Sequence, residues 1–178
     1  LDDAVDLIRG KKGSTVRLKV QQADGAIKEV PLVRDVVELE ETFVRSAVVE
    51  KDGRKYGVIY VPKFYVNFEN EDGRESSDDL AKEIAQLKKE GIEGIVLDLR
   101  NNTGGALTGA VKMGGLFIDQ GPSVQVKTRE GQIRVLPDND PSVAWDGPLV
   151  VLVNEISASA SEIFAGAIQD YGIGTIVG

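Results

Sequence analysis

The sequence predicts a mixed α/β fold in which helices pack on a mostly parallel sheet. Strand patterns alternate along the chain with amphipathic helix patterns, as such folds require. The segment GIVLDL at residues 94–99 is almost continuously apolar, which is typical of a strand buried on both faces. With 178 residues, of which 42% are hydrophobic, the chain can bury a core of this kind.

The first part of the chain predicts a helix followed by a hairpin. Leu1, Val5 and Ile8 share one helical face. Strand patterns at residues 15–22 and 27–33 flank a turn that contains Gly25. An element of about 34 residues buries too little surface to be stable alone, so we expect it to be half of a larger module.

The rest of the chain alternates between strand and helix patterns. Segments rich in valine and aromatic residues predict strands, and apolar residues spaced three or four apart predict helices. The predicted strands are residues 43–50, 56–61, 94–99, 123–128, 132–136, 149–153 and 175–177, and the predicted helices are centred on residues 80–87, 107–117 and 161–171.

Composition excludes several classes of protein. The 21 basic and 29 acidic residues give a net charge of -8 with no basic stripe, which argues against nucleic acid as a partner. No apolar run approaches the roughly 20 residues that a membrane-spanning helix needs. The chain lacks cysteine and histidine, so it has no thiolate site and no recognisable metal site, and no cofactor is implied. It begins at Leu1 without a signal peptide, so we expect an internal piece of a longer protein.

The segment SASASEIFAGAIQDYG, at residues 157–172, has two interpretations. Ser159 and Glu162 fit a capping box, in which a serine and a glutamate satisfy the first amides of a helix. Ser159 also follows the apolar strand PLVVLVN directly, as does the serine of a nucleophile elbow. Without histidine in the chain, the base of such a nucleophile must be an amine or a carboxylate.

A second candidate loop comprises residues 101–105 (NNTGG), between the strand GIVLDL and a predicted helix. Its amides point where anions bind at helix N-termini, and Gly104 and Gly105 allow a ligand to approach closely. A plain turn is the alternative. The charged residues nearby have structural interpretations: an ion pair for Asp98 with Arg100, and a surface carboxylate for Asp170.

Four motifs together resemble the C-terminal processing peptidases, or tail-specific proteases, and especially their long-form bacterial periplasmic members. The motifs are DDAVDLIRGKKGSTVRL, YGVIYVPKFY, VLDLRNNTGGAL and GPLVVLVNEISASASEIFAGAIQDYG. The resemblance implies a PDZ domain inserted in a ClpP/crotonase-like catalytic core. Residues 1–34 would be the C-terminal part of the PDZ domain, and residues 35–178 a peptidase core truncated at its C-terminal end.

The same resemblance implies roles for individual residues. Ser159 corresponds to the nucleophile, Gly104, Gly105 and Ala160 to the oxyanion hole, and Asp170 to an aspartate of the catalytic set. The general base of the family is a lysine in an F-G-K-G motif on the strand after the serine helix, and this sequence does not contain that motif. We therefore expect the 178-residue chain itself to be inactive.

The function that the resemblance implies is a serine endopeptidase with a Ser/Lys dyad. Its substrates would be proteins or peptides with apolar C-termini, its location the periplasm, and adaptor proteins would be candidate partners. A non-catalytic peptide-binding module, or pseudoenzyme, on the same fold is the alternative, because fold alone does not decide activity.

Overall fold

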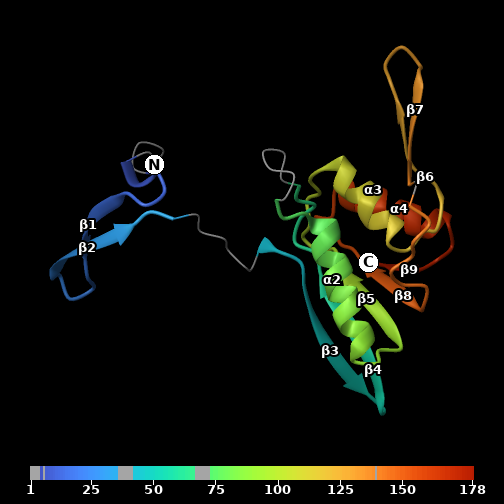
Figure 1. Cartoon of the computed structure of the whole chain (residues 1–178), viewed down its shortest axis with the longest axis horizontal. Helices are drawn as coiled ribbons and strands as arrows, with labels where there is room; N and C mark the ends of the chain where they lie inside the picture. The colour runs from blue at the N-terminus through green and yellow to red at the C-terminus, as the bar shows by residue number, and fades with distance from the viewer. Residues whose placement is uncertain (1–4, 6, 36–41, 67–72, 139) are drawn as a thin grey trace. The chain divides into compact units, whose positions relative to one another are not determined.

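Figure 1 presents a computed structural model of the chain, which describes residues 5, 7–35, 42–66, 73–138 and 140–178. The chain divides into two compact units, Leu1–Glu40 and Glu41–Gly178.

The first unit contains the predicted hairpin. Strand β1 (Thr15–Gln21) pairs antiparallel with β2 (Ile27–Val33), and Thr15 lies opposite Val33. The turn is closed by Asp24, whose Oδ1 accepts a hydrogen bond from Ala26 N–H at 2.9 Å. The hairpin prediction is therefore confirmed.

Arg34 connects this hairpin to the preceding segment. Its Nε donates to Ile8 O at 2.7 Å, and its Nη1 donates to Ser14 Oγ at 3.0 Å. Val5, Leu7 and Ile8 are helical, while Leu1 and most of the first turn of the expected helix lie outside the described residues. The assignment of residues 1–34 to a PDZ domain stays a prediction.

The second unit is built on a five-stranded sheet with the order β3-β4-β5-β8-β9. Strand β3 pairs antiparallel with β4, and the other three pairings are parallel, so the predicted mostly parallel α/β sheet is confirmed. The strands are β3 (Arg45–Lys51), β4 (Arg54–Tyr60), β5 (Gly94–Asp98), β8 (Leu149–Leu152) and β9 (Thr175–Val177). The finer ClpP/crotonase-like assignment stays a prediction.

Strand β5 lies in the middle of this sheet, and four of its five residues are buried, as its apolar sequence predicts. Ile95 and Leu97 are buried in one core with Leu80 and Ile84 of helix α2 (Ser76–Lys89), whereas Val96 between them is only half-buried. Alternate residues of a strand point to opposite faces. One face of the strand is thus packed against helices, and on the other face Val96 is half-buried between the buried Gly94 and Asp98.

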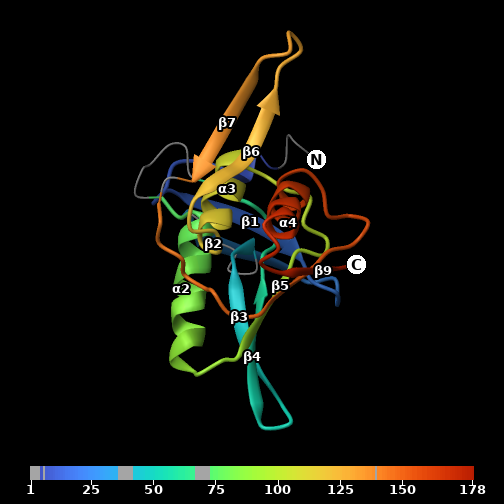
Figure 2. The same cartoon turned by 90° about the vertical axis from the view of Figure 1, so that its right-hand side faces the viewer.

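Three helices and a second hairpin complete the unit. The helices are α2 (Ser76–Lys89), α3 (Leu107–Gly115) and α4 (Ala160–Asp170). Strands β6 (Gly121–Lys127) and β7 (Ile133–Asp138) form a separate two-stranded sheet, which extends outward from the side where α3 and α4 lie (Figure 2).

The sheet topology brings two loops together. Strands β5 and β8 are parallel neighbours, with Asp98 opposite Leu152 near their carboxyl ends. The loop that leads from β5 to α3 and the loop that leads from β8 to α4 therefore leave the same edge of the sheet, where ligands collect in parallel α/β folds.

Candidate active site

Ser159 lies at the turn between β8 and α4 and has a strained backbone. Its φ of 56° and ψ of −116° match the first central position of a type II′ turn, which glycine dominates. Holding a residue with a Cβ in such a region costs about 1–3 kcal/mol. The residue is exposed. A strained, exposed serine on a strand-to-helix turn has the geometry of a nucleophile elbow.

Glu162 caps the same turn, as the capping interpretation predicts. The N–H of Ser159 donates to Glu162 Oε2 at 2.7 Å, and the Ser159 side chain accepts from the N–H of Glu162, so both halves of a capping box are present. This carboxylate binds the backbone of Ser159, so capping by Glu162 and exposure of the Ser159 side chain exist together.

The two flanking serines hold the turn in place. Ser157 Oγ donates to Leu99 O at 2.8 Å, at the end of β5. Ser161 is completely buried, and its Oγ donates to Asn102 O at 2.8 Å. Both hydroxyls therefore have structural partners on the neighbouring loop, which distinguishes them from Ser159.

Gly104 lies directly against the serine turn. A Cβ at this position would lie 2.7 Å from Ala158 O and 2.8 Å from Ser159 Cβ, closer than real Cβ atoms come to such neighbours. Its φ of 99° is also strongly unfavourable for any residue with a side chain. Only glycine therefore allows the loop after β5 to reach Ser159.

Gly105 is held by the segment after β4. Phe64 N–H donates to Gly104 O at 3.0 Å, and Ala106 N–H donates to Phe64 O at 2.8 Å, so Phe64 and Gly105 form an isolated parallel bridge. A Cβ on Gly105 would collide with the carbonyl of Phe64.

The amides of this region differ in their availability. Gly104 N–H donates to Asn102 Oδ1 at 2.8 Å. Within the described ranges, neither Gly105 N–H nor Ala160 N–H has a hydrogen-bond partner. Ala160 N lies 2.9 Å from the place where a Gly104 Cβ would stand, so the two loops touch there. Two free amides beside an exposed hydroxyl can stabilise an anion.

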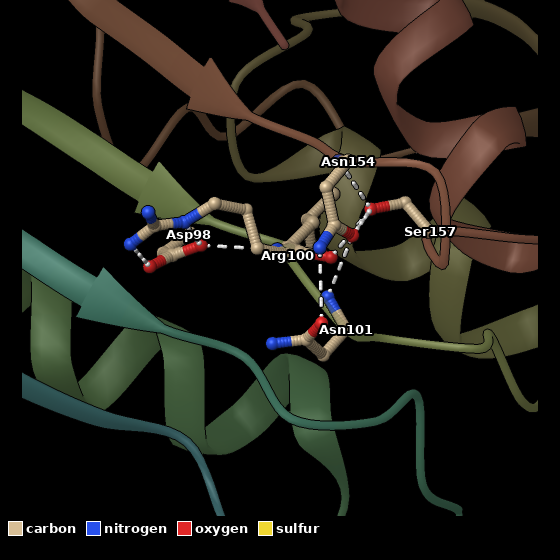
Figure 3. A network of polar contacts seen from close by, with 6 residues as sticks. Asp98, Arg100, Asn101, Asn154 and Ser157 are labelled. Carbon is tan, nitrogen blue, oxygen red and sulfur yellow. Dashed lines mark hydrogen bonds and ion pairs between the residues drawn. The ribbon is translucent and has the colours of Figure 1, made fainter.

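A polar network also binds the two loops together (Figure 3). Asn101 N–H donates to Asn154 Oδ1, and Asn154 Nδ2 donates to Asn101 Oδ1, each at 2.9 Å. Asn154 N–H in turn donates to Ser157 Oγ at 3.0 Å. Two hydrogen bonds between Asn101 and Asn154 thereby join the loop after β5 to the loop after β8.

Asp98 and Arg100 form the ion pair that the sequence predicts. Arg100 Nε and Nη2 donate to Asp98 Oδ1 and Oδ2 at 2.9 and 2.6 Å. Burial alone would raise the pKa of Asp98, but the hydrogen bonds and charge of Arg100 outweigh it and lower that pKa below its usual value. The pair fixes the end of β5 just before the glycine loop.

Asp170 is not brought to the serine. It is the last residue of α4 and is exposed, while Ser159 precedes the first residue of the same helix. At a rise of 1.5 Å per residue, the eleven positions between them span about 16 Å. The described residues give Asp170 no contact with Ser159.

Two pockets lie at opposite ends of β8. One of about 330 Å³ flanks the serine turn. Its lining comes from the loop after β8, from α4 and from β9, and includes Val153, Asn154, Ser157, Glu162, Ala165 and Ile176. The other, of about 290 Å³, lies near Trp145 and Leu149 at the amino end of β8, remote from Ser159.

The sequence interpretation gave no individual role to Asn102. The structure places it in the interior, with its side chain bonded to Gly104 and to Val61 O. An asparagine immediately before a Thr-Gly-Gly turn is the signal that could have drawn attention to it. Its burial could not be read from that pattern.

Among the residues that the structure describes, no group of three or more His, Cys, Asp or Glu could hold a metal ion. Within the same residues, no helix has the length and apolar character that crossing a bilayer requires.

Comparison with known proteins identifies the family. The model of "Peptidase family S41" matches residues 55–178. Over the whole chain, the sequence is 41% identical to a tail-specific protease of Haemophilus influenzae and 38% identical to a carboxyl-terminal-processing protease of Picosynechococcus. The chain spans 25% and 41% of the lengths of these two relatives.

Solved structures agree with this result. The photosystem II D1 C-terminal processing protease matches with a TM-score of 0.63 and 29% identity, over 98% of this chain and 46% of that one. An S41 protease of Bacteroides fragilis shares the fold, with a TM-score of 0.59 over 93% of this chain and 47% of that one, at 20% identity. The predicted resemblance to C-terminal processing peptidases is confirmed, and the chain belongs to peptidase family S41, a membership that supports a serine protease function.

Proposed function

We propose that this chain carries the nucleophile and oxyanion hole of a serine endopeptidase, with Ser159 as the nucleophile. The observation that supports this most directly is the backbone of Ser159, at φ 56° and ψ −116° on the turn between β8 and α4. Strain of this kind persists where the surrounding structure enforces it, and it is concentrated at functional sites. Neither Ser157 nor Ser161 has a positive φ.

In the proposed reaction, Ser159 Oγ attacks the carbonyl carbon of the scissile peptide while its proton passes to a base. The amine product leaves with a proton, and water then releases the acyl group from the serine. The amides of Gly105 and Ala160 donate to the oxyanion. Gly104 contributes close approach rather than a donor, because its N–H already bonds to Asn102. We assign no chemical step to Asp170.

The proposed base is a lysine amine, supplied by the F-G-K-G motif that the 178 residues lack. An exposed lysine has a pKa near 10.4, and removal from water lowers that pKa toward the working range of a base. The pocket of about 330 Å³ beside the turn offers apolar surface from Val153, Ala165 and Ile176 for this purpose. Ser159 Oγ takes part in the capping box with the N–H of Glu162, and no described side chain accepts its proton as a base would.

The remaining features of the proposal rest on the family. Substrates are proteins or peptides with apolar C-termini, bound by a PDZ domain of which the first unit is the closing part, and the enzyme works in the periplasm with adaptor proteins as candidate partners. The separate hairpin unit at residues 15–33 is consistent with such a module.

The test compares cleavage of one unfolded protein with an apolar C-terminus by four proteins at equal concentration. These are the 178-residue chain, a longer form that includes the F-G-K-G motif and the front of the PDZ domain, and that longer form with its lysine changed to alanine or with Ser159→Ala. We expect turnover by the unmodified longer form alone. An oxyanion hole without a base retains a rate enhancement of only about 10³- to 10⁴-fold over the reaction in water.

Two outcomes would count against parts of the proposal. Turnover by the 178-residue chain that disappears in Ser159→Ala would contradict the lysine as base. Tight binding of the tail by the longer form, without any cleavage, would favour the non-catalytic peptide-binding module instead.

A further inference from the structure

Asn102 is completely buried where three segments meet. Its Nδ2 donates to Val61 O at 2.8 Å, at the end of β4, and its Oδ1 accepts from Gly104 N–H at 2.8 Å. Its backbone carbonyl accepts from Ala158 N–H at 3.1 Å and from Ser161 Oγ at 2.8 Å. One residue therefore bonds to the core sheet, to the glycine loop and to the serine turn.

These bonds decide which amides remain available. The N–H of Gly104 is turned inward to Asn102, and its carbonyl is taken by Phe64 N–H. Both polar groups of Gly104 are thus engaged, and the next amide along the loop, that of Gly105, has no partner among the described residues. The side chain of Asn102 in this way sets the orientation of the loop at Gly105.

The backbone carbonyl of Asn102 acts on the other loop. Ala158 and Ser161, the two groups that it accepts from, lie on either side of Ser159 in the sequence. The strained turn is therefore hydrogen-bonded, before and after Ser159, to Asn102, which also orients Gly105. A shift of Asn102 would move the hydroxyl and the amide relative to one another.

We propose that Asn102 is a positioning residue that holds the Gly105 amide and the Ser159 hydroxyl in the relative positions needed for attack on a peptide carbonyl. This inference rests on the proposed function of Ser159. Asn102 acts through the two loops and touches no reacting atom. Misplacing an oxyanion donor lowers kcat by about 10²–10³, while substrate binding elsewhere is retained.

The role requires an amide side chain. Val61 O needs a donor and Gly104 N–H needs an acceptor, and asparagine supplies both at once. Leucine at this position has the same branched arrangement of side-chain heavy atoms and supplies neither. Aspartate supplies both only while its carboxyl is protonated, because an ionised carboxylate accepts but does not donate.

The test uses the longer, active form of the enzyme with Asn102→Leu and Asn102→Asp. We expect kcat to fall about 100-fold or more in Asn102→Leu, with KM changing by less than about threefold. The matched control is Ile84→Ala, which removes a buried side chain of α2 outside both loops. It should lower the melting temperature without a comparable fall in kcat.

Asn102→Asp provides a readout that loss of stability alone would not give. Burial raises the pKa of a carboxyl group, so part of the population is protonated at mildly acidic pH and mimics the amide. We expect the ratio of its kcat to that of the wild type to fall as pH rises. The charged groups around the site, Asp98, Arg100 and Glu162, are present in both proteins and cancel in this ratio.

Hydrogen exchange separates failure of this inference from failure of the proposed function. Segments 102–106 and 157–161 should exchange faster in Asn102→Leu than in the wild type, and unchanged exchange of both would overturn the inference even if no peptidase activity is found. Retained kcat in both Asn102 variants would overturn it too, as would a fall in kcat that only tracks melting temperature as in Ile84→Ala. Activity that survives Ser159→Ala would instead refute the nucleophile.

Discussion

The loops after β5 and β8 both have backbone with positive φ near the contact between them, but different residue types adopt it. Each follows a central parallel strand and precedes a helix, and each contains backbone with positive φ near the point of contact. After β5 the unfavourable conformations closest to the contact fall on Gly104 and Gly105. After β8 they fall on Ser159, which has a side chain.

In the proposed function, this difference distinguishes the loop after β5, whose glycines allow close approach, from the loop after β8, which carries the nucleophile. Glycine adopts positive φ without steric penalty, so Gly104 and Gly105 reach their positions without strain. The third residue of this loop with positive φ is Asn101, at 64°, and asparagine is among the residue types that tolerate that region best. A serine in the same kind of region costs about 1–3 kcal/mol that glycine would save. Ser159 is thus a position where local preference and fold disagree, as is common at functional sites.

The largest expected effect comes from making the two loops alike with Ser159→Gly. Turnover by the longer enzyme should fall to background. The melting temperature of the chain should rise by about 2–4 °C, which corresponds to a net relief of about 1 kcal/mol after the added entropy of glycine in the unfolded chain. Thermal unfolding of wild type, Ser159→Gly and Ser159→Ala checks this. A lower melting temperature in Ser159→Gly than in Ser159→Ala would mean that the backbone there is unstrained.

The next effect comes from adding a side chain to the other loop with Gly104→Ala. The new Cβ would lie within 2.9 Å of three atoms of the serine turn, so we expect a loss of about 3 kcal/mol or more. Gly131→Ala is the matched control, because its φ is +85° but nothing lies within 4 Å. Its loss should be about 1–2 kcal/mol. Equal losses in urea unfolding would show that the contact with Ser159 is unimportant.

Smaller effects are expected from the flanking serines. Ser157→Ala and Ser161→Ala each remove a hydrogen bond to a backbone carbonyl, which costs about 1 kcal/mol. Asn102 O keeps its bond from Ala158 N–H when Ser161 is changed, so it is not left unpaired. Both variants should retain substantial peptidase activity in the longer form. If all three serine variants lost activity in proportion to their melting temperatures, the motif would serve capping alone.

The smallest effect concerns the ion pair before the glycine loop. Because the pKa of Asp98 is lower in the folded chain than its unfolded value of 3.8, the pair stabilises the fold above that pH, and this contribution is lost as pH falls through the folded pKa. Below about pH 4, stability should therefore fall less steeply in Asp98→Asn than in the wild type. Parallel curves of unfolding free energy between pH 5 and 3 would contradict this.

Much of the local structure could be predicted from the sequence because it depends on neighbouring residues. The hairpin at residues 15–33 and the helix after Ser159 follow from turn residues, capping and apolar spacing. The apolar run at 94–99 forms a largely buried strand, as expected, although Val96 on one face is only half-buried. Whether a second layer covers a strand depends on distant segments, which periodicity does not report.

The sequence by itself determined the α/β class, the absence of histidine and the family, and it pointed to Ser159 as the candidate nucleophile. Only the tertiary structure decided which amides are free and that the N–H of Gly104 is bonded to Asn102. It also showed that the length of α4 separates Asp170 from Ser159. The reason is physical. A motif states which groups are present, whereas their distances depend on the pairing of β5 with β8, two strands that are more than fifty residues apart in the chain.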